Sequence, residues 1–286
     1  MEPQQSPLYA KYMSRLHWQI DHVDGVQIFY KRFPLLGTLV KIHRPEKLPS
    51  LKKLIPFLES HRVRRLVVEP AASISQSSFT RWYEGLPSGV RLNRSPFLPT
   101  KTIRIDLTQP TEDIFGSFIE SKRRAVRRAA KLGVTVEESQ DIDALIRVKN
   151  ASSGLFGFIT TTGIRELWNI FSPRHAAILL AYPTSVSRIT YHVSRKPIGG
   201  VLLLFWDSIA YYWIAGAAKE GKKYFAPTLL AHEAMKLAKK RKARQFDFVG
   251  VWDERIPKEN LSWKGFTKFK EGFGGETLYY PLAGRL

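Results

Sequence analysis

Six basic residues stand within ten positions in the middle of the chain, a density that suits binding to a polyanion. They are Lys122, Arg123, Arg124, Arg127, Arg128 and Lys131. On a helix the last four fall on one face, opposite an apolar face that includes Val126 and Ala129. Like charges at this spacing repel one another, and only Glu120 stands near to offset them. We therefore expect this stripe to bind RNA or membrane phosphates; a solvated helix face is the alternative.

The overall charge agrees with such a partner. The 286 residues include 45 Lys and Arg against 25 Asp and Glu, a formal net charge of +20. An excess of this size raises the local concentration of polyanions and speeds their encounter with the protein. A merely soluble basic surface is the alternative. The hydrophobic fraction of 44% is ordinary for a globular protein, so the chain can bury a core.

Several kinds of chemistry are excluded by residue type. The absence of cysteine excludes disulfides, thiolate metal sites and a cysteine nucleophile. The seven histidines are scattered, without the paired spacing of a zinc motif, and no Gly-x-Ser-x-Gly motif is present. We therefore expect neither a metal nor a serine or cysteine nucleophile.

We expect neither a secretory signal nor a membrane-spanning helix in this sequence. Residues Met1–Trp18 lack the apolar core and cleavage site of a secretory signal. The longest apolar stretches, Ala176–Ala181 and Gly199–Trp206, are strand-sized. We expect a cytoplasmic protein with at most a peripheral contact with the inner face of the plasma membrane.

The first third of the chain alternates short strands and helices. Strands are predicted at 26–33, 36–43 and 65–69, with a turn at Pro34–Gly37 and a helix over 48–58 that Pro56 should disturb. The proline-rich loop Leu86–Thr100 is the best domain boundary. We predict domains at 1–100 and 101–286, with the end of the chain free to pack back on the first.

The remainder has a recognisable order of elements. It predicts a strand at 101–107, a helix from Thr108 or Thr111 to Leu132, and helices at 141–152 and 162–171. Four meander strands follow at 176–182, 187–194, 198–206 and 209–216, then a long helix at 226–242 and a strand at 245–249. This is the order of the acetyltransferase-like (GNAT) fold, an α/β (α+β) class with a mixed central sheet.

The turn that would hold coenzyme A in such a fold is unsuited to a pyrophosphate. Between the fourth meander strand and the long helix, residues 217–227 contain one glycine and place Pro227 near the helix start. A phosphate cradle needs bare backbone amides, and proline supplies none. We therefore expect a different acyl donor and no cofactor.

Four segments resemble motifs of one family, in the same order and at similar spacing between residues 101 and 276. Ile105–Leu107 with Lys122–Val134 is similar to "DL…K.R..IRKA.K.GV", and Ala226–Lys236 to the family's long helix. Phe246–Gly250 is similar to "YDFGG", and Phe269–Gly275 to "FK..FGG". These segments resemble the FemABX family of peptidoglycan interpeptide-bridge aminoacyltransferases.

The resemblance implies a fold, a donor and an acceptor. It implies two tandem GNAT-like domains with mixed central sheets, and an enzyme that takes an amino acid from aminoacyl-tRNA. The acceptor would be an amine of a UDP-linked or lipid-linked muropeptide. Two other functions stay open: an acyl-CoA-dependent N-acyltransferase, and a non-catalytic RNA- or membrane-binding protein on a degenerate GNAT fold.

The resemblance also implies a reaction centre at Lys270 and Phe269. The matching family lysine lies by the reacting ester, and the aromatic beside it offers a stacking surface. When an amine attacks the ester, the carbonyl oxygen becomes negative, and a fixed ammonium in a dry cleft stabilises that charge. We predict this role for Lys270, with a surface lysine as the alternative.

Other candidates concern the acceptor. Arg32, Lys41 and Arg44 are predicted to bind substrate phosphates. The family's arginine before "GF" is absent from Ser153–Phe158, and Arg165 is the predicted substitute. Tyr211 or Tyr212 could orient the substrate through its hydroxyl, although packing within the sheet is the alternative for both.

Overall fold

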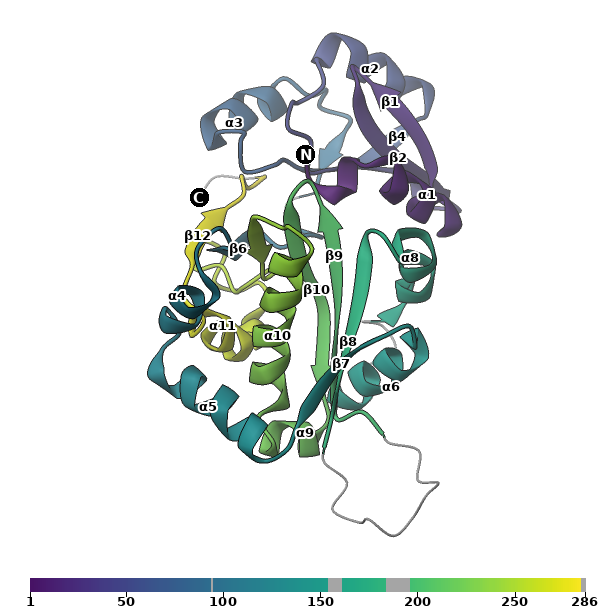
Figure 1. Cartoon of the computed structure of the whole chain (residues 1–286). Coiled ribbons are helices and arrows are strands. Elements are labelled where there is room, and N and C mark those ends of the chain that lie inside the picture. Colours follow the sequence, from purple (N-terminus) through teal and green to yellow (C-terminus); the bar gives the residue numbers. More distant parts are fainter. Residues whose placement is uncertain (94, 154–160, 184–195, 284–286) are drawn as a thin grey trace. The chain divides into compact units, whose positions relative to one another are not determined.

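The structure is a computed structural model that describes residues 1–93, 95–153, 161–183 and 196–283 (Figure 1). The chain divides into two compact units. The first comprises Met1–Thr102, Gly250–Gly265 and Thr277–Leu286, and the second comprises Ile103–Val249 and Phe266–Glu276. The C-terminal part of the chain therefore contributes segments to both units.

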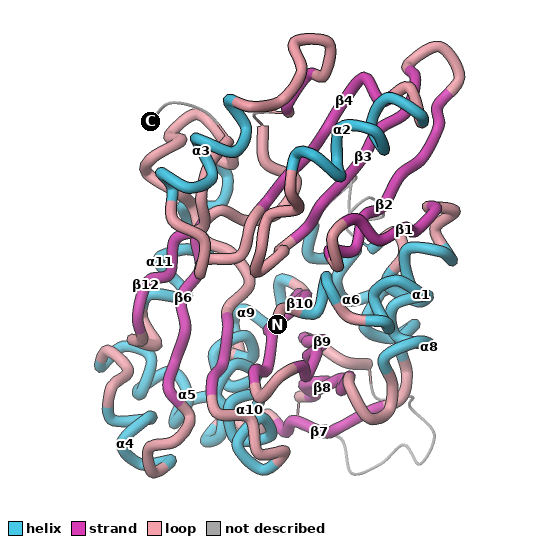
Figure 2. The backbone as a smooth tube through the Cα atoms, turned by 90° about the horizontal axis from the view of Figure 1, so that it is seen from above, coloured by secondary structure: helices cyan, strands magenta, loops and turns pink. Residues whose placement is uncertain are grey.

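The first unit is built on a five-stranded mixed sheet in the order β1-β2-β3-β4-β5 (Figure 2). Strands β1 to β3 pair antiparallel, whereas β4 pairs parallel with both β3 and β5. Its elements are η1 (Pro3–Gln5), α1 (Pro7–Arg15), β1 (Gln19–Val23), β2 (Val26–Phe33), β3 (Gly37–His43), α2 (Leu51–Ser60), β4 (Val63–Glu69), α3 (Gln76–Glu84), β5 (Arg91–Leu92) and η3 (Leu261–Trp263).

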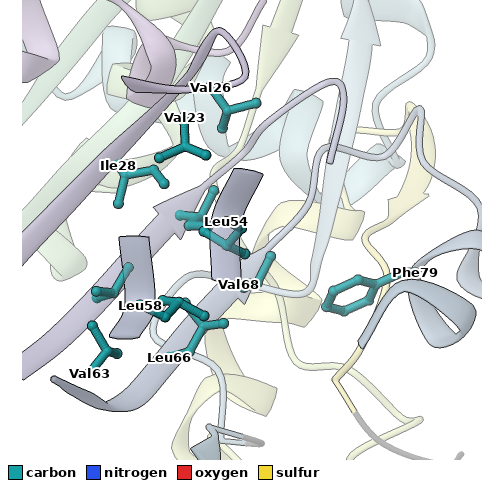
Figure 3. Packing of buried hydrophobic residues seen from close by; sticks show 11 residues of the cluster. Val23, Val26, Ile28, Leu54, Leu58, Val63, Leu66, Val68 and Phe79 are labelled. Carbon is teal, nitrogen blue, oxygen red and sulfur yellow. The ribbon is translucent and has the colours of Figure 1, made fainter. Parts of the chain in front are cut away.

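Helix α2 covers this sheet and closes its core. Leu54 and Leu58 of the helix pack with Ile28 of β2 and Leu66 of β4, all four nearly inaccessible to solvent (Figure 3). The helix continues through Pro56, which lies on its exposed face, where water can satisfy the carbonyl that loses its partner. The predicted disturbance therefore does not end the helix.

The other mixed sheet, most of whose residues belong to the second unit, has seven strands in the order β12-β6-β11-β10-β9-β8-β7. Strands β10 and β11 pair parallel, whereas β7–β8, β8–β9, β9–β10 and β11–β6 pair antiparallel. The elements are β6 (Lys101–Asp106), α4 (Thr111–Gly116), α5 (Glu120–Lys131), β7 (Thr135–Ser139), α6 (Ile142–Ser153), α8 (Ile164–Phe171), β8 (Ala176–Tyr182), β9 (Gly199–Trp206), β10 (Ile209–Ala217), α9 (Lys219–Lys223), α10 (Ala226–Lys240), β11 (Gln245–Asp247), α11 (Lys264–Glu271) and β12 (Glu276–Tyr279).

Glycines in β9 and β10 let helices approach both faces of this sheet. A Cβ added at Gly199 would lie 2.9 Å from Leu230 of α10, whereas one at Gly200 would lie 2.8 Å from Leu145 of α6. Neighbouring residues of a strand face opposite sides, so α10 and α6 cover opposite faces (Figure 1). Gly216 of β10 pairs with Gly200 of β9, and α6 packs closely against both glycines.

The seat of α6 gives a first prediction. A Cβ at Gly216 would lie 2.8 Å from the Cα of Lys149, so Gly216→Ala must push α6 away from the sheet. We expect a loss of about 1–3 kcal/mol in the free energy of unfolding, measured by urea denaturation. Gly116→Ala is the matched control, because a Cβ there meets nothing within 4 Å. Equal stability of the two variants would contradict the close seating of α6.

The predicted single helix from Thr108 or Thr111 to Leu132 is wrong, because the chain forms α4 and α5 with a break between them. The break is stabilised by contacts that sequence periodicity does not reveal. Arg123 donates from its guanidinium to the carbonyls of Gly116 and Phe118. The amide of Ile119 donates to the carbonyl of Gly272, at a distance of 3.0 Å.

Most other predicted elements occur with similar bounds. The strand at 187–194 and residues 154–158 of the segment that lacks the family's arginine fall outside the described residues. The elements α1, β1, α3, β5, β7, α9, α11 and β12 were not predicted. The fold class is confirmed, because the chain combines helices with two mixed sheets, one of five strands and one of seven.

Candidate active site

Lys270 lies on α11 and reaches the end of strand β11. Its Nζ donates to the carbonyl oxygen of Phe248 at 2.7 Å and lies 4.8 Å from the centre of the Phe266 ring. Val249, next in the chain, has a left-handed φ of 54°, so the backbone turns sharply where the lysine binds. Such sparsely populated backbone conformations concentrate at functional sites.

The sheet opens at the same place. β10 pairs parallel with β11 only from Ile209 opposite Gln245 to Tyr211 opposite Asp247. Beyond that point β11 has ended, whereas β10 continues to Ala217 alongside β9, with an irregularity between Tyr212 and Ile214. Lys270 therefore binds the chain just beyond the last paired residue of β11.

The surroundings of Lys270 disfavour its charge. Burial lowers the pKa of its ammonium from 10.5 to about 7; the carboxylate of Asp247 opposes this effect and the cation of Lys149 adds to it. Removal of an ammonium from water disfavours its charged form and so lowers its pKa. A negative charge forming nearby would be stabilised strongly by this ammonium, as an oxyanion in acyl transfer requires.

Asp247 is buried and holds the end of β11 in place. Its Oδ2 accepts from Nε of Arg104 on β6 at 2.7 Å, and its Oδ1 accepts from the amide of Val249 at 2.7 Å. These two bonds fix the strand end whose next carbonyl binds Lys270. Asp247 therefore has a structural role beside the lysine as well as an electrostatic one.

Lys149 is a site residue that the sequence analysis missed. It lies on α6 directly above Gly216 of β10, and burial lowers its pKa. The sequence signal is its place on a helix: Lys149 follows Leu145 by four residues, so it shares the apolar face that packs on the sheet. A lysine on a buried face is a stronger candidate for chemistry than an exposed one.

Replacement of Lys149 gives a second prediction. In Lys149→Gln the pKa of Lys270 should rise, because a neighbouring cation that disfavours its charge is removed. If transfer needs the ammonium, the rate at pH 8 relative to that at pH 6 should be about 2–3-fold higher than in the unaltered protein. Arg147→Gln, an exposed cation on the same helix, is the control. A shift of the profile to lower pH would contradict the proximity of the two lysines.

Phe269 and Lys122, predicted separately, lie together. Nζ of Lys122 lies 3.9 Å from the centre of the Phe269 ring and 5.2 Å from that of Phe273. Burial lowers the pKa of Lys122 to about 8, and its stem packs against Gly272. The side chain of Lys122, on α5, is thus half-buried against the C-terminal end of α11 and does not belong to the exposed basic face of α5. Its ammonium forms a cation–π contact with the Phe269 ring.

Of the other five residues of the predicted stripe, Arg123 is hydrogen-bonded to backbone carbonyls and the remaining four are exposed. Arg123 binds the break between α4 and α5. Arg124, Arg127, Arg128 and Lys131 are exposed on α5. Arg127 and Arg128 stack on the rings of Phe115 and Phe225, at 5.6 and 5.4 Å. Binding of a polyanion by the exposed members stays a prediction.

The candidates for the acceptor in the second unit lie in different settings. Tyr211 and Tyr212 of β10 are both buried, and the Tyr212 ring lies 5.8 and 5.6 Å from those of Phe246 and Phe248. Burial raises the pKa of Tyr212. Arg165 on α8 is exposed and forms an ion pair of 2.5 Å with Asp143. The substrate roles of these residues stay predictions.

The phosphate-binding candidates belong to the first unit. Arg32 on β2 is exposed. Nζ of Lys41 lies 4.5 Å from the ring centres of both Trp18 and Phe97, and burial lowers its pKa. Arg44 is buried, stacks 3.4 Å from the ring centre of Tyr280, and donates to the carbonyls of Pro70 and Pro99. Of the three, Arg32 is exposed, Lys41 is partly buried and Arg44 is buried. Their binding of phosphates stays a prediction.

The turn before α10 is filled by protein. Residues Lys219–Lys223 form the short helix α9, and Phe225 adopts a left-handed conformation before α10 begins. The amides of Thr228 and Leu229 both donate to the carbonyl of Phe225, and Pro227 has no amide hydrogen. The first turn of α10 therefore offers few donors to a pyrophosphate.

Two absences hold for the described part of the chain. In that part no three His, Cys, Asp or Glu side chains group as metal ligands. None of its helices is both long enough and apolar enough to cross a membrane.

Comparisons with known proteins show which solved structures share this fold. No curated protein matches the chain. A structure of FemX is similar to it, with 16% identity, a TM-score of 0.70, and coverage of 99% of this chain and 92% of that one. The C-terminal domain (DUF2156) of a protein described as a lysylphosphatidylglycerol synthetase from Agrobacterium fabrum has 14% identity and a TM-score of 0.59, covering 97% and 87%. L-PGS from Bacillus licheniformis has 12% identity and a TM-score of 0.57, covering 96% and 86%.

The sequence itself matches a family model over more than half of its length. The model is that of the acetyltransferase (GNAT) domain, and it matches residues 116–264. This stretch contains β7 to β11, including the strands that separate beside Lys270. The chain therefore belongs to the acetyltransferase (GNAT) domain family of acyltransferases, and its fold is FemABX-like, which confirms the resemblance that its motifs predicted.

Proposed function

We propose that the protein transfers an amino acid from aminoacyl-tRNA to an amine of a peptidoglycan precursor, with Lys270 as the catalytic cation. The observation that carries the proposal is the setting of Lys270. Its ammonium is desolvated beside the point where β10 and β11 separate, where it donates to the carbonyl of Phe248 close to the carboxylate of Asp247. A charge held in this way gains most from an anion that appears during the reaction.

The reaction needs no further activation of the donor. The acceptor nitrogen attacks the ester carbonyl carbon, and a C–N bond forms as the carbonyl oxygen takes up negative charge beside Lys270. The C–O bond to the ribose then breaks, the carbonyl reforms, and the proton lost by the amine ends on the ribose oxygen. The protein aligns amine and ester, excludes water and stabilises the oxyanion.

Three observations favour an aminoacyl-tRNA donor over coenzyme A. The turn before α10 is occupied by α9 and by internal hydrogen bonds of the helix start. Exposed cations on α5 suit a phosphodiester backbone. FemX and the lysylphosphatidylglycerol synthetase domain share the fold. The name of the second protein describes a product that carries a lysyl group, as transfer of an amino acid would give. The acceptor rests on the FemABX motifs and is a UDP-linked or lipid-linked muropeptide.

A label-transfer assay tests the proposal. Purified protein is mixed with a pool of radiolabelled aminoacyl-tRNAs and with UDP-linked and lipid-linked muropeptide precursors. Label should move to a muropeptide, and Lys270→Met should abolish most of it, whereas Lys268→Met, an exposed lysine of the same helix, should not. Tight binding of acetyl-CoA with acetyl transfer, or binding of tRNA without any transfer, would overturn the proposal in favour of its two rivals.

A further inference from the structure

The turn between β2 and β3 in the first unit exposes two leucines. Leu35 is 102% exposed and Leu36 is 59% exposed, at the tip of a hairpin closed by Phe33 opposite Gly37. Leu35 also has a φ of 66°, a left-handed conformation that glycine or asparagine would adopt at lower cost. Neither burial nor local conformation within the chain explains a leucine at this position.

Cations surround this tip. The segments that meet there, 31–39 and 59–65, contain five lysines and arginines and one acid, Glu59. The cations are Lys31, Arg32, Arg62, Arg64 and Arg65. Arg64 is exposed and its stem lies against Gly37, because a Cβ there would be 3.2 Å from its Cδ. Arg32 is exposed on β2 opposite Thr38, whose hydroxyl binds the carbonyl of His61 and so brings the exposed Arg62 near.

Aromatic residues lie next to the strands that lead to this turn, since Phe33 ends β2 and Trp18 precedes β1. The Trp18 and Phe33 rings meet edge to face at 6.4 Å, and Nζ of Lys31 lies 5.9 Å from the Phe33 ring centre. This arrangement matches the layers of a bilayer surface. It has apolar side chains at the tip, an aromatic pair next to the strands, and cations around the turn. Leucines enter the acyl region, tryptophan prefers the interface, and arginines bind lipid phosphates.

We propose that the β2–β3 turn anchors the protein to an anionic phospholipid membrane. Leu35 and Leu36 insert below the headgroups, and Arg32, Arg62 and Arg64 bind lipid phosphates. RNA fits the tip less well, since it offers the leucines no apolar region. A second copy of the chain fits less well too, because the cations around the two tips would repel.

Vesicle co-sedimentation tests the anchor without any substrate, so its outcome is independent of the transfer reaction. The protein should bind vesicles that contain about 30 mol% phosphatidylglycerol and bind pure phosphatidylcholine weakly, with the difference reduced by salt. The double variant Leu35→Ser/Leu36→Ser should lower the partition coefficient by about 30-fold or more. Arg62→Gln/Arg64→Gln should lower it by about 10-fold on the anionic vesicles alone.

The matched control is Leu261→Ser, because Leu261 is 56% exposed in the same unit and lies outside the hairpin. Its binding should be unchanged. Since the chain has no cysteine, Leu36→Cys can carry a single polarity-sensitive dye, whose emission should shift to the blue on anionic vesicles. The proposal is overturned by absence of vesicle binding, by equal binding of the Leu35→Ser/Leu36→Ser variant, or by a dimer in ultracentrifugation that this variant dissociates.

Discussion

Replacing Lys270 with methionine is expected to lower the transfer rate by about 10²–10³-fold while making the protein more stable. The loss follows from removal of the cation that meets the oxyanion. The gain follows because methionine fills a similar volume without a charge that burial disfavours. Single-turnover transfer and urea unfolding measure the two effects. Lys268→Met, on the exposed side of α11, should change neither.

The effect of Lys270→Met on the free energy of unfolding should depend on pH. The pKa of Lys270 is about 7 in the folded protein and 10.5 in its ordinary environment, so the unfolded chain binds more protons between these values. The unaltered protein therefore carries the full cost of the buried charge below pH 7 and loses that cost as pH rises towards 10.5. The advantage of Lys270→Met should be at most about 5 kcal/mol at pH 6, reduced by loss of the hydrogen bond to Phe248, and it should decline as pH rises to 10.5.

The transfer rate of the unaltered protein should change in the same pH window. If the ammonium stabilises the oxyanion, the rate falls as pH rises through about 7, because the active form is the protonated one. Because the acceptor amine must also lose its proton, the rates are compared after division by the fraction of unprotonated amine. A corrected rate that rises through this pH would assign Lys270 the role of general base. A variant Lys270→Met that is inactive and also destabilised at pH 6 would contradict the burial of its charge.

Replacing Asp247 with alanine is expected to cost about 3–5 kcal/mol in the free energy of unfolding. The variant removes the acceptor of Arg104 and of the Val249 amide at the end of β11, and it leaves the guanidinium without its buried counter-ion. It also removes the negative charge that favours protonation of Lys270. Urea unfolding measures the first effect.

The control for Asp247→Ala is an ion pair that differs in burial. Asp143 and Arg165 are 2.5 Å apart, closer than Asp247 and Arg104 at 2.7 Å. The side chain of Asp143 is 48% exposed, whereas that of Asp247 is 2% exposed. Water replaces a lost partner at an exposed site, so Asp143→Ala should cost less than about 1 kcal/mol. Similar losses in the two variants would show that burial does not decide the strength of these pairs.

Much of the fold was predictable because its signals are local. The strands β2 and β8 have the predicted bounds, and the long helix α10 begins where it was predicted. Apolar periodicity depends only on neighbouring residues, so it survives in any tertiary context. The break between α4 and α5 was not predictable, because it depends on the bond from Ile119 to Gly272, far along the chain.

The candidate site divides in the same way. The motif "FK..FGG" identified Lys270 and Phe269. The motif does not show whether the Lys270 ammonium is buried or exposed to water. Lys149 was missed because it is remote in sequence and comes close only when α6 settles on Gly216. The sequence predicts one exposed basic stripe over residues 122–131. In the structure Lys122 departs from this stripe, because its side chain is half-buried beside Phe269.

The amino-acid sequence alone predicts most of the order of the elements, the motifs of a FemABX-like chain and the excess of positive charge. Folding establishes which cations are desolvated, which bind carbonyls or carboxylates, and which remain exposed. The physical reason is that the free energy of a charge depends on the dielectric and the partners around it. Those are supplied by segments that meet only after folding, as Lys270, Phe248 and Lys149 do here.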